Sequence, residues 1–151
     1  VIVVNIVNYK KGKVYKPKLS KKPVSKEVIE YCEKGYYLYC HGEQGASIKY
    51  YDKALEIAPE YIYAWEKKGW AFDSIRNYTE ALKCYDKIIE INPEYADAWV
   101  NKSYSVLKLG KYDEAIKCQD KIIELAPDRA SQCRRNKEYI LNLKKNNKKY
   151  E

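Results

Sequence analysis

Apolar residues recur along this chain at the spacing of one helix face, and the same pattern returns every thirty-four residues. Three segments carry it: KYYDKALEIAPEYIYAW (49–65), KCYDKIIEINPEYADAW (83–99) and KCQDKIIELAPDRASQC (117–133). Aspartates and prolines align across them, at Asp52, Asp86 and Asp120 and at Pro59, Pro93 and Pro127. A fixed period of this length indicates stacked units that bury their apolar faces against one another.

Each period divides into two amphipathic helices. In the segment 62–75, Trp65, Gly69 and Phe72 fall at i, i+4 and i+7, which places them on one stripe. A second stripe follows and stops at Pro93, because proline removes an amide donor and clashes with the preceding turn. The pattern predicts helices at about 28–41, 45–58, 62–75, 96–109 and 130–145, with two more that end before Pro93 and Pro127.

Side chains that suit helix ends mark several of these boundaries. Ser25 is placed to cap the first helix. Thr79 and Asp113 are the candidate N-caps of the second helices in the two later units. Gly110 suits the end of the helix at 96–109, where a left-handed residue often terminates a helix.

The recurring residues match a known signature, in which Trp, Gly, aromatic, Ala and Pro residues stand at fixed offsets. The three units supply Tyr31, Gly35, Ser47, Tyr51, Ala54 and Pro59; then Trp65, Gly69, Phe72, Ala81, Tyr85 and Pro93; then Trp99, Ser103 at the glycine site, Ala115 and Pro127. The chain therefore resembles the tetratricopeptide repeat (TPR) family.

This resemblance implies an all-α fold. We expect a right-handed superhelical array of three TPR helix-turn-helix repeats, at 28–61, 62–95 and 96–129, followed by a C-terminal capping helix at about 130–145. The TPR domain then spans residues 26–151, and a basic, non-repeat N-terminal extension occupies residues 1–25.

Two features depart from the family pattern. The leucine before the glycine is replaced by lysine in all three repeats, at Lys34, Lys68 and Lys102. A lysine stem can cover apolar surface while its amine reaches water, so we expect the helices to persist. Isoleucine replaces a small residue at Ile88 and Ile122, and this bulk predicts a wider spacing between helices.

In TPR proteins the first helix of each repeat lines a concave groove. Family phase places Tyr36, Trp70 and Tyr104 at one equivalent site, as an aromatic ladder along that groove. The candidate site comprises Tyr36, Tyr63, Lys67, Trp70, Asn101, Tyr104 and Lys108. The resemblance implies a non-enzymatic scaffold whose groove binds a peptide or an amphipathic helix of a partner protein. The alternative is that the aromatic residues only pack neighbouring helices together.

Some TPR domains hold the C-terminal carboxylate of chaperones with Lys, Asn and Arg side chains. The corresponding positions here are Cys32, Tyr36, Lys67, Asp97 and Asn101. Lys67 alone is cationic, and Asp97 would repel a carboxylate. The sequence therefore predicts that this groove does not bind such tails.

Charge is divided unevenly along the chain. Residues 1–26 carry eight lysines and no acid, residues 27–128 carry 13 basic and 19 acidic groups, and residues 129–151 carry eight basic and two acidic groups. The basic ends leave weak RNA or anion binding as an alternative, although we do not expect nucleic acid as the main partner. The apolar segment 1–7 could form a strand or a latch, which leaves self-assembly into a homo-oligomer as another alternative.

The sequence offers no chemistry that indicates an enzyme. It has neither a GxxxxGK[ST] loop nor a GxSxG elbow, and its one histidine has no nominated partner. None of the five cysteines forms a CxxC pair, so we expect no metal and no cofactor. Cys84 and Cys118 should be buried. The recurring aspartates are expected on a solvent face, paired with lysines of their own helix.

The expected location of the protein follows from two signals that the sequence lacks, a membrane-spanning helix and a signal peptide. No apolar run approaches the roughly 18 residues of a bilayer-spanning helix, and no membrane partner is expected. The odd cysteine count without a signal peptide favours the cytoplasm.

Overall fold

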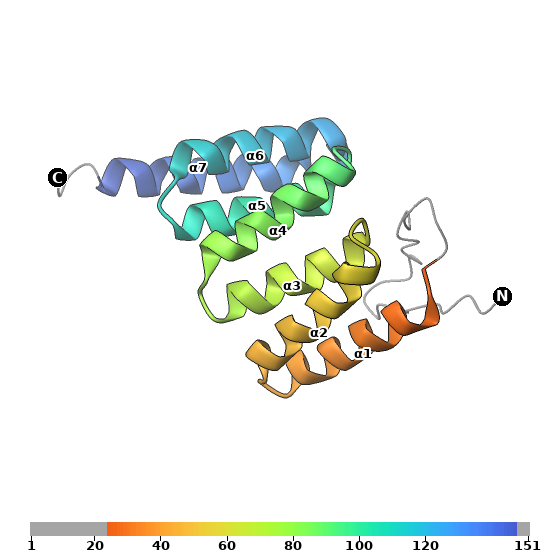
Figure 1. Ribbon diagram of the computed structural model, residues 1–151. Helices are drawn as coiled ribbons and strands as arrows, with labels where there is room; N and C mark the ends of the chain where they lie inside the picture. The colour runs from red at the N-terminus through yellow and green to blue at the C-terminus, as the bar shows by residue number, and fades with distance from the viewer. Residues whose placement is uncertain (1–23, 148–151) are drawn as a thin grey trace.

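The computed structural model describes residues 24–147, and within them every regular element is helical (Figure 1). The helices are α1 (Lys26–Cys40), α2 (Gln44–Ile57), α3 (Ile62–Ser74), α4 (Tyr78–Ile91), α5 (Ala96–Lys108), α6 (Tyr112–Leu125), the short 3-10 helix η1 (Pro127–Arg129) and α7 (Ala130–Asn147). The predicted all-α array of three helix pairs with a closing helix is confirmed. Most of the extension predicted for residues 1–25 lies outside the described residues.

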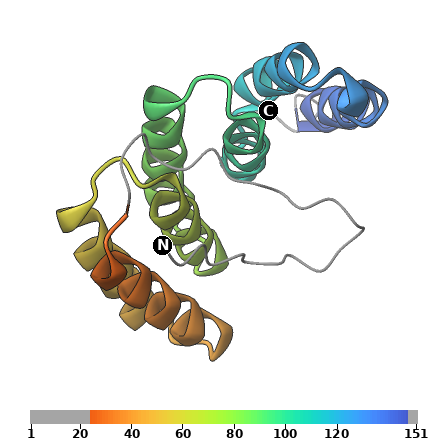
Figure 2. The same cartoon turned by 90° about the vertical axis from the view of Figure 1, so that its right-hand side faces the viewer.

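Each helix packs mainly against the helices before and after it in the chain. The pairs α1–α2, α3–α4 and α5–α6 lie side by side, and α7 covers the open face of α6. Figure 2 shows the row of helices curving around a concave side. The array is therefore built from contacts between sequence neighbours, as stacked repeats require.

The prolines occupy equivalent corners. Pro59, Pro93 and Pro127 each stand two residues after the last residue of α2, α4 or α6. At the first two corners a tryptophan indole donates to the proline carbonyl, with Trp65 Nε1 2.7 Å from Pro59 O and Trp99 Nε1 3.1 Å from Pro93 O. These bonds tie the start of the next helix to the corner. At the third corner, where cysteine stands in place of tryptophan, the chain forms η1.

A missing side chain sets the distance between the two helices of a pair. A Cβ added at Gly69 would lie 2.5 Å from Cε1 of Tyr85, and one at Gly35 would lie 2.8 Å from Cε1 of Tyr51. Both rings are fully buried. The third pair replaces this contact with a hydrogen bond of 2.7 Å from Gln119 Nε2 to the serine at the glycine site.

The turns within the three pairs share one backbone shape. Gly42 and Gly110 adopt φ angles of +80° and +73°. Arg76, thirty-four residues after Gly42, adopts +60° although it carries a side chain. A non-glycine residue in this left-handed region costs about 1 kcal/mol, so this turn is the strained one of the three.

Two of the predicted caps are wrong. Asn77, rather than Thr79, caps α4, because its Oδ1 accepts from the amide of Glu80 at 3.4 Å. Helix α6 begins at Tyr112, two residues earlier than a cap at Asp113 implies, so Asp113 lies inside its first turn and bonds Lys144 of α7 instead. The predicted cap at Ser25 is confirmed, since its hydroxyl accepts from the amide of Val28.

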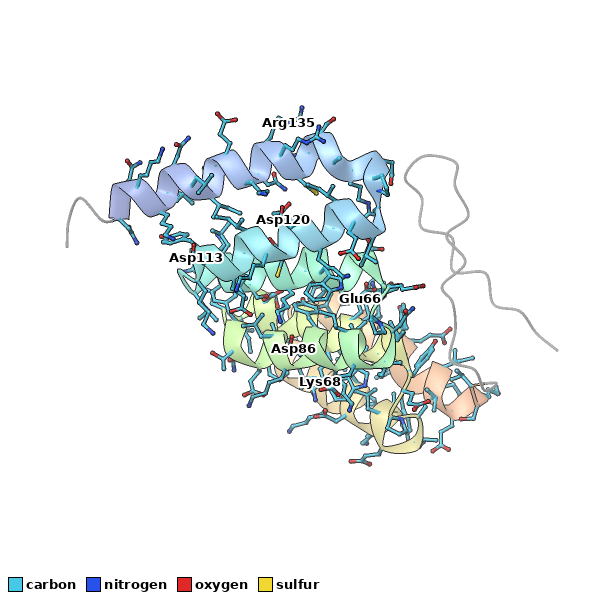
Figure 3. The ribbon with its side chains drawn as sticks, turned by 90° about the horizontal axis from the view of Figure 1, so that it is seen from above. Glu66, Lys68, Asp86, Asp113, Asp120 and Arg135 are labelled. Carbon is cyan, nitrogen blue, oxygen red and sulfur yellow. The ribbon has the colours of Figure 1, made fainter. Side chains whose placement is uncertain are left out.

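The recurring aspartates bridge successive pairs, which corrects the prediction that lysines of the same helix hold them. Asp52 bonds Lys68 at 2.6 Å, Asp86 bonds Lys102 at 2.7 Å, and Asp120 bonds Lys137 (Figure 3). In each case the lysine belongs to the first helix of the following pair or to α7. This contact gives a partner to the lysine before the glycine site in the second and third repeats, at Lys68 and Lys102.

We predict that Gly69→Ala lowers the free energy of unfolding by about 2 kcal/mol, since the buried ring of Tyr85 has no room to retreat. Gly45→Ala is the matched control. Nothing lies within 4 Å of a Cβ at that position, and alanine should stabilise helix α2 by about 0.5 kcal/mol. Urea denaturation followed by circular dichroism measures both, and equal effects would contradict this account.

Candidate functional site

The three aromatic residues of the expected ladder lie one on each of α1, α3 and α5. Tyr36 and Tyr104 are about half exposed, at 46% and 48%, whereas Trp70 is half-buried. Within residues 24–147 no ring contact joins the three directly. They stand as separate aromatic positions on successive helices, and Val100 adds an exposed apolar side chain on α5.

Each exposed tyrosine ring contacts another aromatic ring of the chain. Tyr36 stacks on Tyr39 with 6.5 Å between ring centroids. Tyr104 meets the edge of Tyr78 at 6.2 Å, and the ammonium of Lys108 lies 5.3 Å from its ring centroid. Each of the two exposed rings therefore has an aromatic neighbour within the chain.

Lys67 is only 8% exposed, which the sequence did not predict. Its Nζ lies 3.4 Å from the ring centroid of Trp70, 5.2 Å from that of Tyr63, and 3.7 Å from Oε2 of Glu66. Burial lowers the pKa of Lys67, while the charge of Glu66 opposes that shift. The sequence predicted that Lys67 is a cation of the groove, whereas in the structure its ammonium contacts Tyr63, Glu66 and Trp70 of the same helix.

Two further positions of the chaperone-tail set form bonds within the chain, Asp97 through its side chain and Asn101 through its backbone. The carboxylate of Asp97 bonds the guanidinium of Arg129 at 2.6 Å. The backbone carbonyl of Asn101 accepts from the hydroxyl of Ser105 at 3.4 Å. Of the five positions that correspond to a chaperone-tail site, Cys32 is buried, and burial raises its pKa to about 12.

Asp73 forms a connection that the sequence did not reveal. Its carboxylate accepts from the hydroxyl of Tyr85 on α4 and from the hydroxyl of Ser105 on α5, each at 2.7 Å. Three helices from two pairs therefore meet at one side chain. The equivalent positions are Tyr39 and Leu107, so no periodic signal marks this residue.

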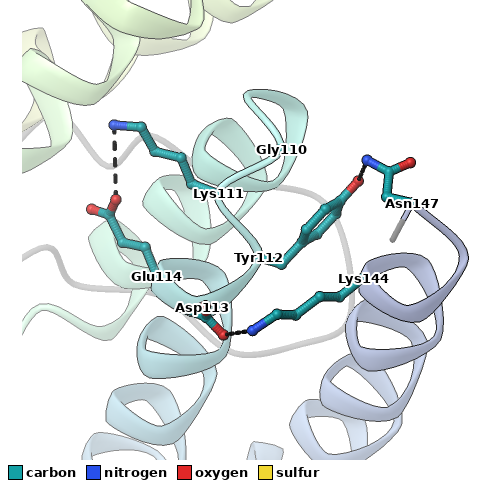
Figure 4. Close-up of a pocket in the computed structure, with 7 residues that line it drawn as sticks. All are labelled: Gly110, Lys111, Tyr112, Asp113, Glu114, Lys144 and Asn147. Atoms are coloured by element: carbon teal, nitrogen blue, oxygen red, sulfur yellow. Dashed lines mark hydrogen bonds and ion pairs between the residues drawn. The ribbon is translucent and has the colours of Figure 1, made fainter. Parts of the chain in front are cut away.

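The polar hollow beside the start of α6 is a junction between helices (Figure 4). Asp113 bonds Lys144, Glu114 lies 3.9 Å from Lys111, and the amide of Asn147 donates to the hydroxyl of Tyr112 at 2.9 Å. The charged side chains of this hollow pair with one another, and the bonds of Lys144 and Asn147 hold α7 against α6.

The part of the chain that the structure describes has neither a metal-binding cluster nor a membrane-spanning helix. No group of three His, Cys, Asp or Glu side chains between residues 24 and 147 is placed to hold a metal ion. Among the helices of the same range, none combines the length and the apolar composition that a bilayer crossing needs.

Two tetratricopeptide repeat profiles match this chain, one over residues 31–61 and one over residues 66–130, which together exceed half of its length. The chain belongs to the tetratricopeptide repeat family. No curated protein matches it.

Solved TPR domains have the same fold. The chain is similar to the first TPR domain of Spaghetti (RPAP3) bound to the HSP90 peptide SRMEEVD, with 19% identity, a TM-score of 0.72, and 79% of this chain and 94% of that chain covered. It is similar to the second TPR domain of human RPAP3 in complex with the HSP70 peptide SGPTIEEVD, with 20% identity, a TM-score of 0.69, and coverage of 76% and 94%. It is also similar to the Sgt2 TPR domain from Aspergillus fumigatus, with 18% identity, a TM-score of 0.73, and 83% of each chain covered.

Burial raises the pKa of Asp73, although the hydroxyls of Tyr85 and Ser105 oppose the shift. The folded chain therefore holds this proton more tightly than the unfolded chain. The contribution of Asp73 to stability is greatest in acid and falls as pH rises through the raised pKa. We compare the free energy of unfolding of the wild type with that of Asp73→Asn. We predict that the wild-type value minus the variant value decreases between about pH 4 and pH 7. Urea titrations across that range measure it, and a difference that grows with pH would refute the assignment.

Proposed function

We propose that this chain is a non-enzymatic protein-interaction module whose concave groove, lined by α1, α3 and α5, binds a peptide or helix of a partner protein. The groove residues are Tyr36, Tyr63, Lys67, Trp70, Asn101, Tyr104 and Lys108. The observation that carries the proposal is the exposure of Tyr36 and Tyr104, two large aromatic side chains at equivalent positions of α1 and α5. Aromatic residues that only packed helices together would be buried.

The physical basis is the area that such rings remove from water. A tyrosine has few rotatable bonds, so a partner that covers it immobilises little. Its hydroxyl can stay hydrated or accept a hydrogen bond at the rim of the interface. Tyrosine and tryptophan are accordingly enriched among the residues that dominate binding energy. Val100, exposed on α5, adds apolar area beside them.

Similar TPR domains support the same class of ligand, since they have been solved with HSP90 and HSP70 peptides. The alternatives from the chain ends, self-assembly through residues 1–7 and anion binding through the basic termini, rest largely on residues outside the described range. The exposed aromatic residues of the groove favour peptide binding over these two alternatives.

We predict that Tyr36→Ala with Tyr104→Ala weakens peptide ligands of the groove by at least about tenfold, because two interface anchors are lost. Peptides selected from a displayed library against the full chain provide the ligands, and calorimetry provides the dissociation constants. Tyr37→Ala with Tyr139→Ala is the matched control, since those rings are 55% and 59% exposed but lie at other phases of α1 and α7. Equal losses in both double variants would contradict the assignment.

The groove should not bind a chaperone tail. Lys67 is enclosed by its own helix, and Asp97 adds an acid where a carboxylate would lie. We predict that the peptide SRMEEVD binds with a dissociation constant weaker than about 1 mM, which corresponds to less than about 4 kcal/mol of binding free energy. Calorimetric titration of the full chain tests this, and micromolar affinity would overturn it.

A further inference from the structure

The ammonium of Lys67 sits among two aromatic rings and a carboxylate. Its distances to the ring centroids of Trp70 and Tyr63 are 3.4 Å and 5.2 Å, and Oε2 of Glu66 is 3.7 Å away. We call Tyr63, Glu66 and Trp70 the cation cage. Aromatic faces attract cations through their quadrupole, and the attraction grows when the group is desolvated, as it is here. The arrangement is thus a cation site that is already filled.

Contacts that do not involve the lysine hold the cage in shape. The hydroxyl of Tyr95 donates to Oε1 of Glu66 at 3.2 Å, which leaves Oε2 to face the ammonium. Tyr63 packs against the buried cluster of the first helix pair, and Trp70 packs against that of the second pair. Removal of the lysine side chain would therefore leave the walls supported. Figure 3 labels Glu66 among the packed helices.

The resident lysine is poorly suited to the site it fills. Glu66 and Lys67 are consecutive in α3, and consecutive side chains on a helix do not face each other. The lysine stem must bend to bring its amine to the carboxylate. Burial lowers the pKa of Lys67, which shows that loss of hydration opposes its charge. A lysine released to solvent would recover that hydration.

The local charge favours a cation even when Lys67 leaves. Burial raises the pKa of Glu66, Lys67 lowers it, and the negative charge of Asp97 raises it again. Asp97 shares its own charge with Arg129 at 2.6 Å. Without Lys67, the buried carboxylate of Glu66 would need a new positive partner.

The cage is confined to the second helix pair within residues 24–147. The residues thirty-four positions away from its members lack the combination of two rings and an acid, being Ile29, Cys32 and Tyr36 on α1 and Asp97, Val100 and Tyr104 on α5. A ligand with one positive group would therefore be fixed in register along the groove.

We propose that the cation cage binds the alkylammonium group of a lysine or methylated lysine from a partner peptide, and that Lys67 is the internal occupant which this group displaces. The inference deepens the proposed function, on which the protein nature of the partner rests. The affinity of the cage for a cation does not depend on it.

Tetramethylammonium is the probe, and the full chain with Lys67→Ala is the main variant. The vacated cage should bind the probe at least about tenfold more tightly than the wild type, in which the lysine competes. Shifts of the indole N–H signal of Trp70 in NMR titrations report the binding. Trp65 and Trp99 serve as internal references, because their indoles are bonded to proline carbonyls.

Three controls make the result decisive. The neutral analogue tert-butanol should not bind, and Lys67→Ala combined with Glu66→Gln should lose most of the affinity for the probe. Lys67→Gln repeats the experiment should the alanine variant fold poorly by circular dichroism. Equal affinity of wild type and vacated cage for the probe, or equal binding of tert-butanol, would overturn the proposal.

A second arm separates this inference from the proposed function. Library peptides that bind the wild-type groove should contain a lysine, and its replacement by norleucine should weaken them at least about tenfold. If the probe binds the vacated cage but no library peptide binds the wild-type groove, the cage is supported and the groove proposal is refuted. Peptide ligands that neither contain nor need a lysine would refute the cage as a partner site and leave the groove proposal intact.

Discussion

The close contact between a glycine and a tyrosine ring is the constraint on which the first two helix pairs depend. The rings of Tyr51 and Tyr85 occupy the space that a side chain at Gly35 or Gly69 would take. This contact sets how near the two helices of a pair approach each other. Tyr36 and Trp70 each follow one of these glycines by one residue. In the third pair a buried serine–glutamine hydrogen bond holds the same place.

Much of the fold is predictable because stacked repeats have few long-range choices. Each helix packs against its sequence neighbours, so the periodic apolar stripe and the proline corners already specify the partners. The helix ranges, the capping role of the segment after Pro127 and the burial of Cys84 and Cys118 follow from the pattern. The exposed tyrosines on α1 and α5 follow from the family phase as well.

Three features could not be predicted from the sequence, for physical reasons: the ion pairs of the aspartates, the enclosure of Lys67 and the cap of α4. Asp52 had lysines available on its own helix and on the next pair, and exposed ion pairs differ too little in energy for spacing to decide. The enclosure of Lys67 depends on how a flexible stem bends among Tyr63, Glu66 and Trp70, and helical spacing says nothing of that bend. The cap at Asn77 was not predicted because α4 begins at Tyr78, two residues earlier than a cap at Thr79 implies.

The carboxylate of Asp73 has a consequence for how the array opens. It joins α3, α4 and α5, and its bond to Ser105 adds a partly buried hydrogen bond to the apolar surface that the second and third pairs share. The first pair is joined to its neighbour by apolar contacts, by the ion pair of Asp52 with the partly exposed Lys68, and by the bond of the Trp65 indole to Pro59. In a one-dimensional array, unequal joints divide the row into units that open separately. Amide protons of α1 and α2 would then exchange with solvent while the remaining helices stay closed.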